Sequence, residues 1–261
     1  MLFVYILLFA AYDVNFTEWR ESMSIEKYTA IILSAGSGSR MKSDIPKQYM
    51  ELSGAPVIYY SIKAFEESPV DDIVIVCGAS DIEYFRSSIV DKYGFKKIKA
   101  IVAGGKERYN SVYEGLKAAE GADYVLIHDG ARPLVDADII ERSMQAVHKS
   151  KACVVGMPVK DTIKVADENG FSAGTPDRKY LWQIQTPQSF SYKLLAEAYD
   201  RLYNDMQSGK KVPSITDDAM IIEYASDTKV MLVEGSYTNI KVTTPEDMGV
   251  AEVLLKKSKK S

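Results

Sequence analysis

Glycines and positively charged side chains follow the first clear β-branched run of the chain. The segment LSAGSGSRM (33–41) contains Gly36, Gly38 and Arg40, and Lys47 comes shortly after it. Glycines allow backbone N–H groups to approach a phosphate closely. Fixed cations beside such a loop suit a triphosphate, whose charge must be neutralised while one phosphorus is attacked. A tight turn with two solvated cations explains this stretch equally well when it is considered alone.

Two familiar nucleotide-binding templates do not fit this loop. A dinucleotide-binding fingerprint needs glycine where Met41 stands, and an acidic residue at the end of the next strand, which here ends in Cys77-Gly78. A Walker A loop needs Gly-Lys followed by Ser or Thr, which is also missing. The sequence therefore disfavours a hydride-transferring dehydrogenase.

Two later apolar runs also end in residues that suit anions or metals. One is followed by Gly105, Lys106 and Ser111, and the other by Asp129 and Arg132. A carboxylate after an apolar run is costly unless it is paired or bound to a metal. Asp129 is therefore a candidate ligand for Mg²⁺, which takes one or two carboxylates together with phosphate oxygens, and Arg132 would clamp a second anion. A salt bridge between Asp129 and Arg132 is the alternative.

Other conspicuous residues have simpler explanations. His128 is one of only two histidines, and a lone histidine at the end of a strand is more often structural than catalytic, so we assign it no role. Thr216, followed by Asp217, would by itself be a helix cap with first-turn acids.

Apolar, β-branched runs alternate with amphipathic stretches from Thr29 onward. This alternation predicts an α/β fold with parallel strands, right-handed crossovers and helices on both faces. Ligands of such sheets bind outside the carboxyl ends of the strands. The predicted strands are 29–33, 72–77, 98–102, 124–128, 153–157 and 229–233. The predicted helices are 57–67, 81–92, 108–120, 136–149, 192–207, 217–226 and 245–257.

Two regions depart from the alternation. Residues 159–180 contain short alternating segments around Glu168-Asn169-Gly170, a good hairpin signal. Such an arm has open edges, which a second copy of the protein would cover most simply. Residues 1–28 are interpreted as an N-terminal extension outside the catalytic fold, with Met23 as an alternative start, and 29–261 as one domain.

Composition excludes several classes of protein. The net charge of −4 gives no sign of nucleic-acid binding. The apolar run at 1–12 is shorter than the roughly 20 residues that span a bilayer, so no membrane association is expected. Cys77 and Cys153 lie in apolar runs and are interpreted as buried thiols of a cytoplasmic protein.

Eight motifs in this order resemble the 2-C-methyl-D-erythritol 4-phosphate cytidylyltransferases of the non-mevalonate isoprenoid pathway. The resemblance extends from about residue 29 to residue 253. The motifs are AGSGSRM, PKQY, GGKERYNSV, HDGARP, DTIK, TPQSF, TDDA and NIKVTTPED.

The resemblance implies a Rossmann-like, three-layer nucleotidyltransferase fold that forms a homodimer through the arm at about 159–180. It implies that CTP and a polyol phosphate react, with Mg²⁺, to give a CDP-polyol and pyrophosphate. By motif, Arg40 and Lys47 would be catalytic cations on the CTP phosphates, and Asp129 would bind Mg²⁺. The remaining roles are nucleotide binding by Ser34, Ala35, Gly36, Gly38, Gly105, Lys106, Ser111 and Lys241, and substrate binding by Arg132, Thr162, Thr186, Thr216 and the partner subunit's Arg178.

Two positions differ from the commonest family pattern. Ser34 stands where alanine or proline is frequent, and Gly130 where alanine is usual. Both replacements are small and remove no charge, so we expect them to be tolerated.

A ribitol 5-phosphate cytidylyltransferase is the nearest alternative, although TDDA and Glu223 favour the methylerythritol enzyme. A catalytically idle homologue would be expected to lack cations such as Lys47 and Lys241 or the carboxylate of Asp129, and all of these are present.

Overall fold

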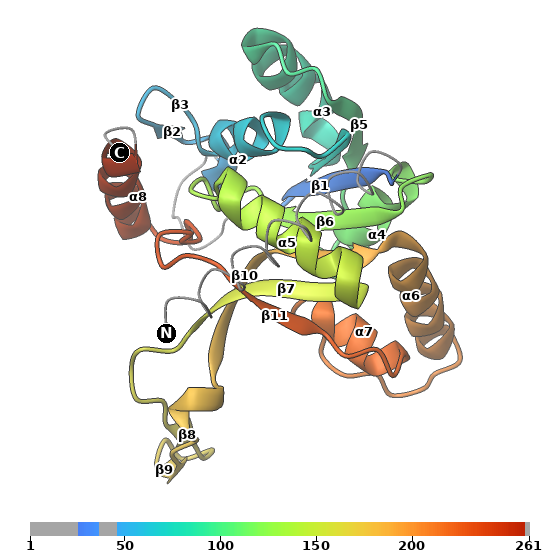
Figure 1. The fold of residues 1–261 in the computed structure, drawn as a ribbon, viewed down its shortest axis with the longest axis vertical. Coiled ribbons are helices and arrows are strands. Elements are labelled where there is room, and N and C mark those ends of the chain that lie inside the picture. Colours follow the sequence, from blue (N-terminus) through green and yellow to red (C-terminus); the bar gives the residue numbers. More distant parts are fainter. Residues whose placement is uncertain (1–25, 37–45, 259–261) are drawn as a thin grey trace, which may run out of the picture.

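The computed structural model describes residues 26–36 and 46–258. A seven-stranded sheet lies at its centre (Figure 1). In spatial order the strands are β11 (Met231–Glu234), β7 (Ala152–Pro158), β10 (Trp182–Ser191), β6 (Tyr124–Asp129), β1 (Tyr28–Ser34), β4 (Asp72–Cys77) and β5 (Ile98–Ala103). β10 is antiparallel to both of its neighbours, and all other pairs are parallel. The predicted, mostly parallel α/β sheet is confirmed.

Helices cover both faces of this sheet (Figure 1). The first face carries α2 (Val57–Glu66), α3 (Ile82–Phe85) and α5 (Ala137–Ser150), and the second carries α4 (Arg108–Ala118), α6 (Tyr192–Gln207) and α7 (Ala219–Ala225). The central strands are buried on both sides, which is why they are almost continuously apolar. A third apolar cluster joins α8 (Pro245–Ser258) to the short strands β2 (Glu51–Leu52) and β3 (Ala55–Pro56).

The structure differs from the predicted elements at β10 and at residues 81–92. No strand was predicted at β10, because its run WQIQTPQSFS is polar and contains a proline. Pro187 lies in an irregularity of pairing between Ile184 and Gln188, where a proline is tolerated inside a sheet. The continuous α-helix predicted over 81–92 is wrong. The segment consists of a 3₁₀ turn (Ala79–Asp81), α3 and a π-helical turn (Arg86–Asp91).

The region predicted to form an arm contains β8 (Val165–Ala166), β9 (Ser172–Gly174) and a 3₁₀ turn (Arg178–Tyr180). It projects away from the body of the molecule (Figure 1). The hairpin turns at Gly170, whose φ of 84° is in the left-handed region that favours glycine. Large apolar side chains on the arm are exposed, namely Ile163, Val165, Phe171 and Tyr180.

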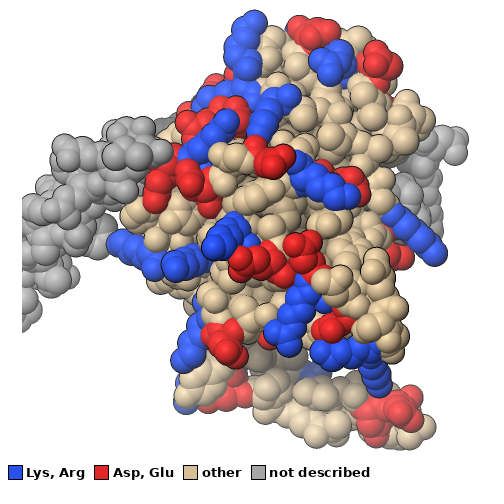
Figure 2. Space-filling view, turned by 90° about the vertical axis from the view of Figure 1, so that its right-hand side faces the viewer, with Lys and Arg blue, Asp and Glu red and all other residues tan. Residues whose placement is uncertain are grey.

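Acidic and basic side chains lie close to one another on one face of the molecule (Figure 2). On the face drawn in Figure 2 they are interspersed, with no broad area of a single charge among the described residues. Within the same described part of the chain, no helix has the length and apolar character needed to cross a membrane.

Candidate active site

The main site lies at the carboxyl ends of β1 and β6. After β1 the chain continues to β4 and β5 on one side, and it then returns to place β6 on the other side of β1. This reversal separates the loops that follow β1 and β6, and it creates the crevice in which α/β sheets bind ligands. The cavity there measures about 310 Å³. It is lined by Leu33, Ser34, Ala35, Gly36, Lys47, Gln48, Lys106, Glu107, Arg108, Ser111, Asp129, Ala131, Lys241 and Thr243.

The described part of the glycine loop is held by Gln48. This buried side chain donates its amide hydrogens to the carbonyls of Ser34 (2.7 Å) and Gly36 (3.1 Å). Gln48 is the third residue of the PKQY motif, in which only Lys47 was predicted to be a site residue. Gly38 and Arg40 lie outside the described residues.

The loop after β5 closes the second wall of the cavity. The Gly105 N–H donates to Ser111 Oγ at 3.1 Å. A Cβ atom on Gly104 would lie 2.5 Å from the Ala35 Cβ and 2.7 Å from Ser111 Oγ, so only glycine lets the two loops approach this closely. Lys106 is exposed at the rim.

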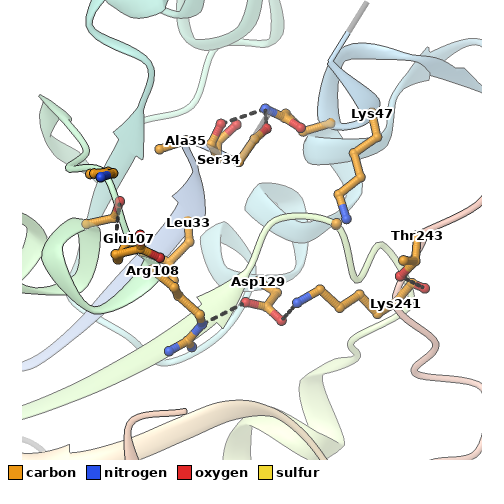
Figure 3. A pocket seen from close by; sticks show the side chains of 14 residues that line it. Leu33, Ser34, Ala35, Lys47, Glu107, Arg108, Asp129, Lys241 and Thr243 are labelled. Carbon is orange, nitrogen blue, oxygen red and sulfur yellow. Dashed lines mark hydrogen bonds and ion pairs between the residues drawn. The ribbon is translucent and has the colours of Figure 1, made fainter. Parts of the chain in front are cut away.

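Asp129 is surrounded by three cations, and Figure 3 shows two of them, Arg108 and Lys241. Its carboxylate lies 2.7 Å from Lys241 Nζ, 3.6 Å from Arg108 Nε and 3.8 Å from Arg132 Nε. Burial favours the neutral acid, but the charges of Arg108, Lys241 and Arg132 outweigh it and hold the pKa of Asp129 well below its usual value. Asp129 is therefore a permanent anion, as a metal ligand must be.

Lys47 reaches the same cavity from the opposite wall (Figure 3). Its ammonium donates to the Val242 carbonyl at 2.8 Å, and the Val242 N–H donates to the Ala131 carbonyl. Lys47 and Lys241 thus face one space from different parts of the chain. Four basic residues and two acidic residues line the cavity, which suits a polyanionic ligand.

Arg108 was not selected from the sequence, although it lies in the GGKERYNSV motif. Its guanidinium donates to the fully buried Asp218 at 2.7 Å and faces Asp129 with its Nε. Gln188 supports the same corner, because its side-chain oxygen accepts the Asp218 and Ala219 N–H groups. The role of Arg108 becomes visible through its ion pair with Asp218, which lies 110 positions further along the chain.

The predicted substrate-binding residues are not among those that line this cavity. Arg132 is buried and donates to the carbonyls of Asn239 and Ile184. Thr186 is buried beside Asp129. The other three are exposed: Thr162 and Arg178 on the arm, and Thr216 before α7.

The two cysteines are free and completely buried. Burial raises the pKa of Cys77 to about 11 and that of Cys153 to about 12. The interpretation of both as buried, unpaired thiols is confirmed.

Comparison with known proteins agrees with the motifs. The family model for 2-C-methyl-D-erythritol 4-phosphate cytidylyltransferase matches residues 28–257. Proteins of that name from Lachnospira eligens and Lachnoclostridium phytofermentans are 52% and 49% identical, covering 87% and 89% of this chain and 99% and 97% of their own lengths. The crystal structure of 4-diphosphocytidyl-2C-methyl-D-erythritol synthase from Anaerococcus prevotii superposes with a TM-score of 0.78 at 33% identity, over 90% of this chain and 98% of that one. This chain belongs to the 2-C-methyl-D-erythritol 4-phosphate cytidylyltransferase family.

Proposed function

We propose that the protein transfers CMP from CTP to 2-C-methyl-D-erythritol 4-phosphate, giving CDP-methylerythritol and pyrophosphate. The reaction would take place in the cavity at the carboxyl ends of β1 and β6. Family membership over 28–257 identifies the reaction. The observation that carries the assignment of this cavity is that Lys47, Lys241 and Asp129 meet in it. Ribitol 5-phosphate is not favoured as the acceptor, because the reported relatives carry the methylerythritol name.

The reaction needs no protein nucleophile. A phosphate oxygen of the acceptor, already an anion, forms a new bond to the α-phosphorus of CTP. The bond between that phosphorus and the bridging oxygen breaks, and pyrophosphate leaves with the electron pair. The protein contributes position and positive charge where negative charge develops.

The catalytic cations of the proposal are Lys47 and Arg40. Lys47 lies on the wall beside the glycine loop, with its ammonium facing the cavity. Lys241 would grip the triphosphate after leaving its ion pair with Asp129. Ser34 and Ala35, with Gly105, Lys106 and Ser111, would hold cytosine and ribose, and Gly36 and Gly38 would bind the nucleotide as part of the glycine loop.

Mg²⁺ is part of the proposal, with Asp129 as its protein ligand. A single ionised carboxylate is a hard oxygen donor of the kind that Mg²⁺ shares with substrate phosphates. No cluster of three or more His, Cys, Asp or Glu side chains suited to a metal is found in the described ranges, so phosphate and water oxygens would complete the set. When bound, the metal would neutralise phosphate charge and help to orient the triphosphate.

The acceptor would lie near Arg132, Thr162, Thr186 and Thr216, with the partner subunit's Arg178 reaching it across a homodimer. The exposed apolar side chains of the arm support this proposal, because a second copy would cover them. We also place the enzyme in the cytoplasm, where its two free thiols would stay reduced.

The test is pyrophosphate release by the purified full chain with CTP and Mg²⁺. We expect turnover with 2-C-methyl-D-erythritol 4-phosphate and its loss when EDTA replaces Mg²⁺. Turnover with ribitol 5-phosphate but not with 2-C-methyl-D-erythritol 4-phosphate would overturn the proposed acceptor. No turnover with either acceptor would favour a catalytically idle homologue. Turnover that persists in EDTA would remove the metal from the proposal.

A further inference from the structure

We propose that His128 is a positioning residue for the reaction: it fixes the Thr186 hydroxyl and the Arg132 backbone, and through them the setting of Asp129. The inference rests on the proposed function, because it assigns His128 to the same site. It also changes the part played by Thr186, whose hydroxyl holds the protein rather than the acceptor's phosphate.

The His128 ring makes contacts in three directions. The ring is completely buried and packs at 5.2 Å from the Phe65 ring. Its Nε2 lies 3.2 Å from the Arg132 carbonyl oxygen, and its Nδ1 lies 2.9 Å from Thr186 Oγ1. His128 therefore joins β6 to β10 and to the loop that follows Asp129.

The hydrogen-bond partners determine where the protons of His128 and Thr186 lie. A carbonyl oxygen only accepts, so Nε2 must carry a hydrogen and donate it to Arg132. The buried ring hydrogen-bonds a carbonyl through Nε2 and a hydroxyl through Nδ1, with no carboxylate of the described residues at either nitrogen. A buried imidazolium without an anionic partner is costly, so the ring is neutral and its Nδ1 is an acceptor. The Thr186 hydroxyl therefore donates its single proton to His128.

The Thr186 hydroxyl has a further hydrogen bond besides the one to His128. Its oxygen also accepts the Asp129 backbone N–H at 3.1 Å. With its proton on His128, the hydroxyl has nothing to donate to a phosphate, which is itself an acceptor. Its function is to hold the backbone of Asp129 in place. The adjacent carbonyl of Thr186 is fixed as well, by the Asn239 side chain at 3.0 Å.

The consequence is a buried frame beneath the charged site. Asp129 is held through its N–H by Thr186, and Arg132 is held through its carbonyl by His128 and by Ser61. Asp129 must stay within a few tenths of an ångström of its working position if it is to serve a transition state. Loosening the frame should therefore lower kcat more than it raises KM.

Kinetics of Thr186 variants test this role. Thr186→Val removes the hydroxyl with little change of shape, whereas Thr186→Ser keeps it. We expect Thr186→Val to lower kcat about tenfold or more, with the KM for CTP and for the acceptor changed less than about threefold. Thr186→Ser should restore kcat to within about threefold of wild type. A rise of tenfold or more in the acceptor KM with kcat preserved would instead show a direct phosphate contact and overturn the proposal.

His128 variants separate the two hydrogen bonds. The Asn oxygen in His128→Asn can replace the Nδ1 acceptor, and the Gln amide in His128→Gln can replace the Nε2 donor. Each should lower kcat, and the losses caused by His128→Gln and Thr186→Val should be less than additive in the double variant, because both remove the hydrogen bond between these two side chains. Full additivity would contradict a shared frame. His148→Gln is the control, since His148 pairs with Glu26 outside the site, and it should keep wild-type kinetics.

A spectroscopic measurement is independent of both folding defects and activity. With only two histidines in the chain, ¹⁵N-histidine labelling of His148→Gln leaves the His128 ring as the one signal. We expect a protonated Nε2 and an unprotonated, hydrogen-bonded Nδ1 at neutral pH, unchanged when the acceptor is added. The opposite tautomer, a doubly protonated ring, or loss of the Nδ1 hydrogen bond on adding the acceptor would overturn the proposal. An inactive wild-type enzyme with the expected tautomer would contradict the proposed function but not the frame.

Discussion

The Arg108 guanidinium lies 2.7 Å from the carboxylate of Asp218, a side chain with no exposed surface. The pair joins the first residue of α4 to the residue that precedes α7. The Arg108 Nε faces Asp129 at 3.6 Å. Arg108 thus connects three elements whose positions define the site. Its loss should lower both the free energy of unfolding and the turnover.

Arg108→Met should lower the free energy of unfolding by about 3 kcal/mol at pH 8, because it leaves Asp218 buried without its partner. Urea unfolding measures this. Burial raises the pKa of Asp218, and Arg108 opposes that rise. In the variant the native state will hold a proton that the unfolded chain has lost. The stability deficit should therefore grow as the pH rises from 5 to 8.

The matched control for Arg108→Met is Lys117→Met. Lys117 forms an exposed ion pair with Glu114 at 2.9 Å, and its loss should change stability by no more than about 0.5 kcal/mol. The double variant Arg108→Met, Asp218→Leu should be more stable than Arg108→Met alone, since it removes the stranded carboxylate. Equal costs for Arg108→Met and the control would refute the structural importance of the buried pair.

Lys47→Ala should depress turnover by on the order of 10²–10³, the usual loss when one transition-state cation is removed. Thermal unfolding should change little by comparison, because the side chain is only partly buried. Lys193→Ala is the control, because Lys193 is exposed on α6 and forms a surface ion pair with Glu197 at 3.9 Å. Turnover of Lys47→Ala close to that of wild type would end its assignment as a catalytic residue. Arg40→Ala should behave in the same way as Lys47→Ala.

Gly130→Ala should destabilise this chain, although the motif resemblance led us to expect alanine at that position. A Cβ there would collide with Ile58 Cδ1 and would lie 2.8 Å from the Leu33 carbonyl oxygen. We expect a loss of about 1–3 kcal/mol, as for other overpacked sites. Ile58→Val removes the colliding methyl, so the double variant should recover part of the loss in a urea titration. A purely additive result would show that the two positions are not coupled.

Both thiols should be inert in the folded protein. Burial raises the pKa of Cys77 to about 11 and of Cys153 to about 12, against about 8.5 in an unfolded chain. At pH 8, DTNB should react with fewer than 0.1 thiols per native chain in minutes, and with both after guanidinium is added. Because the folded pKa values are raised, the stability that these thiols contribute is lost as the pH rises above about 9. Rapid reaction of the native protein would contradict their burial.

The arm offers a separate test of the proposed homodimer. Phe171 and Val165 expose 73% and 52% of their surface in one copy. Phe171→Asp with Val165→Asp should shift sedimentation from dimer to monomer, and it should also lower turnover if the partner subunit's Arg178 completes the acceptor site. Tyr84→Asp, exposed on α3 away from the arm, is the control. A wild-type chain that sediments as a monomer would overturn the dimer.

The amino-acid sequence by itself determined the α/β class and the residues that follow β1, β5 and β6. These depend on local patterns: buried strands are apolar on both faces, and glycines with cations after a strand mark an anion site. Gly36, Lys47, Lys106, Ser111 and Asp129 were therefore found in advance and line the cavity. Ser34 and Lys241 were found through the motifs of the family.

Only the tertiary structure decided how these residues are supported. β10 was missed because a polar run with a proline carries no strand pattern, yet pairing with β6 and β7 makes it central. The roles of Arg108 and His128 depend on Asp218 and Thr186, which are 110 and 58 positions away. A hydrogen bond between distant segments leaves no local periodicity, so no motif shows which of several polar residues the fold will bring together.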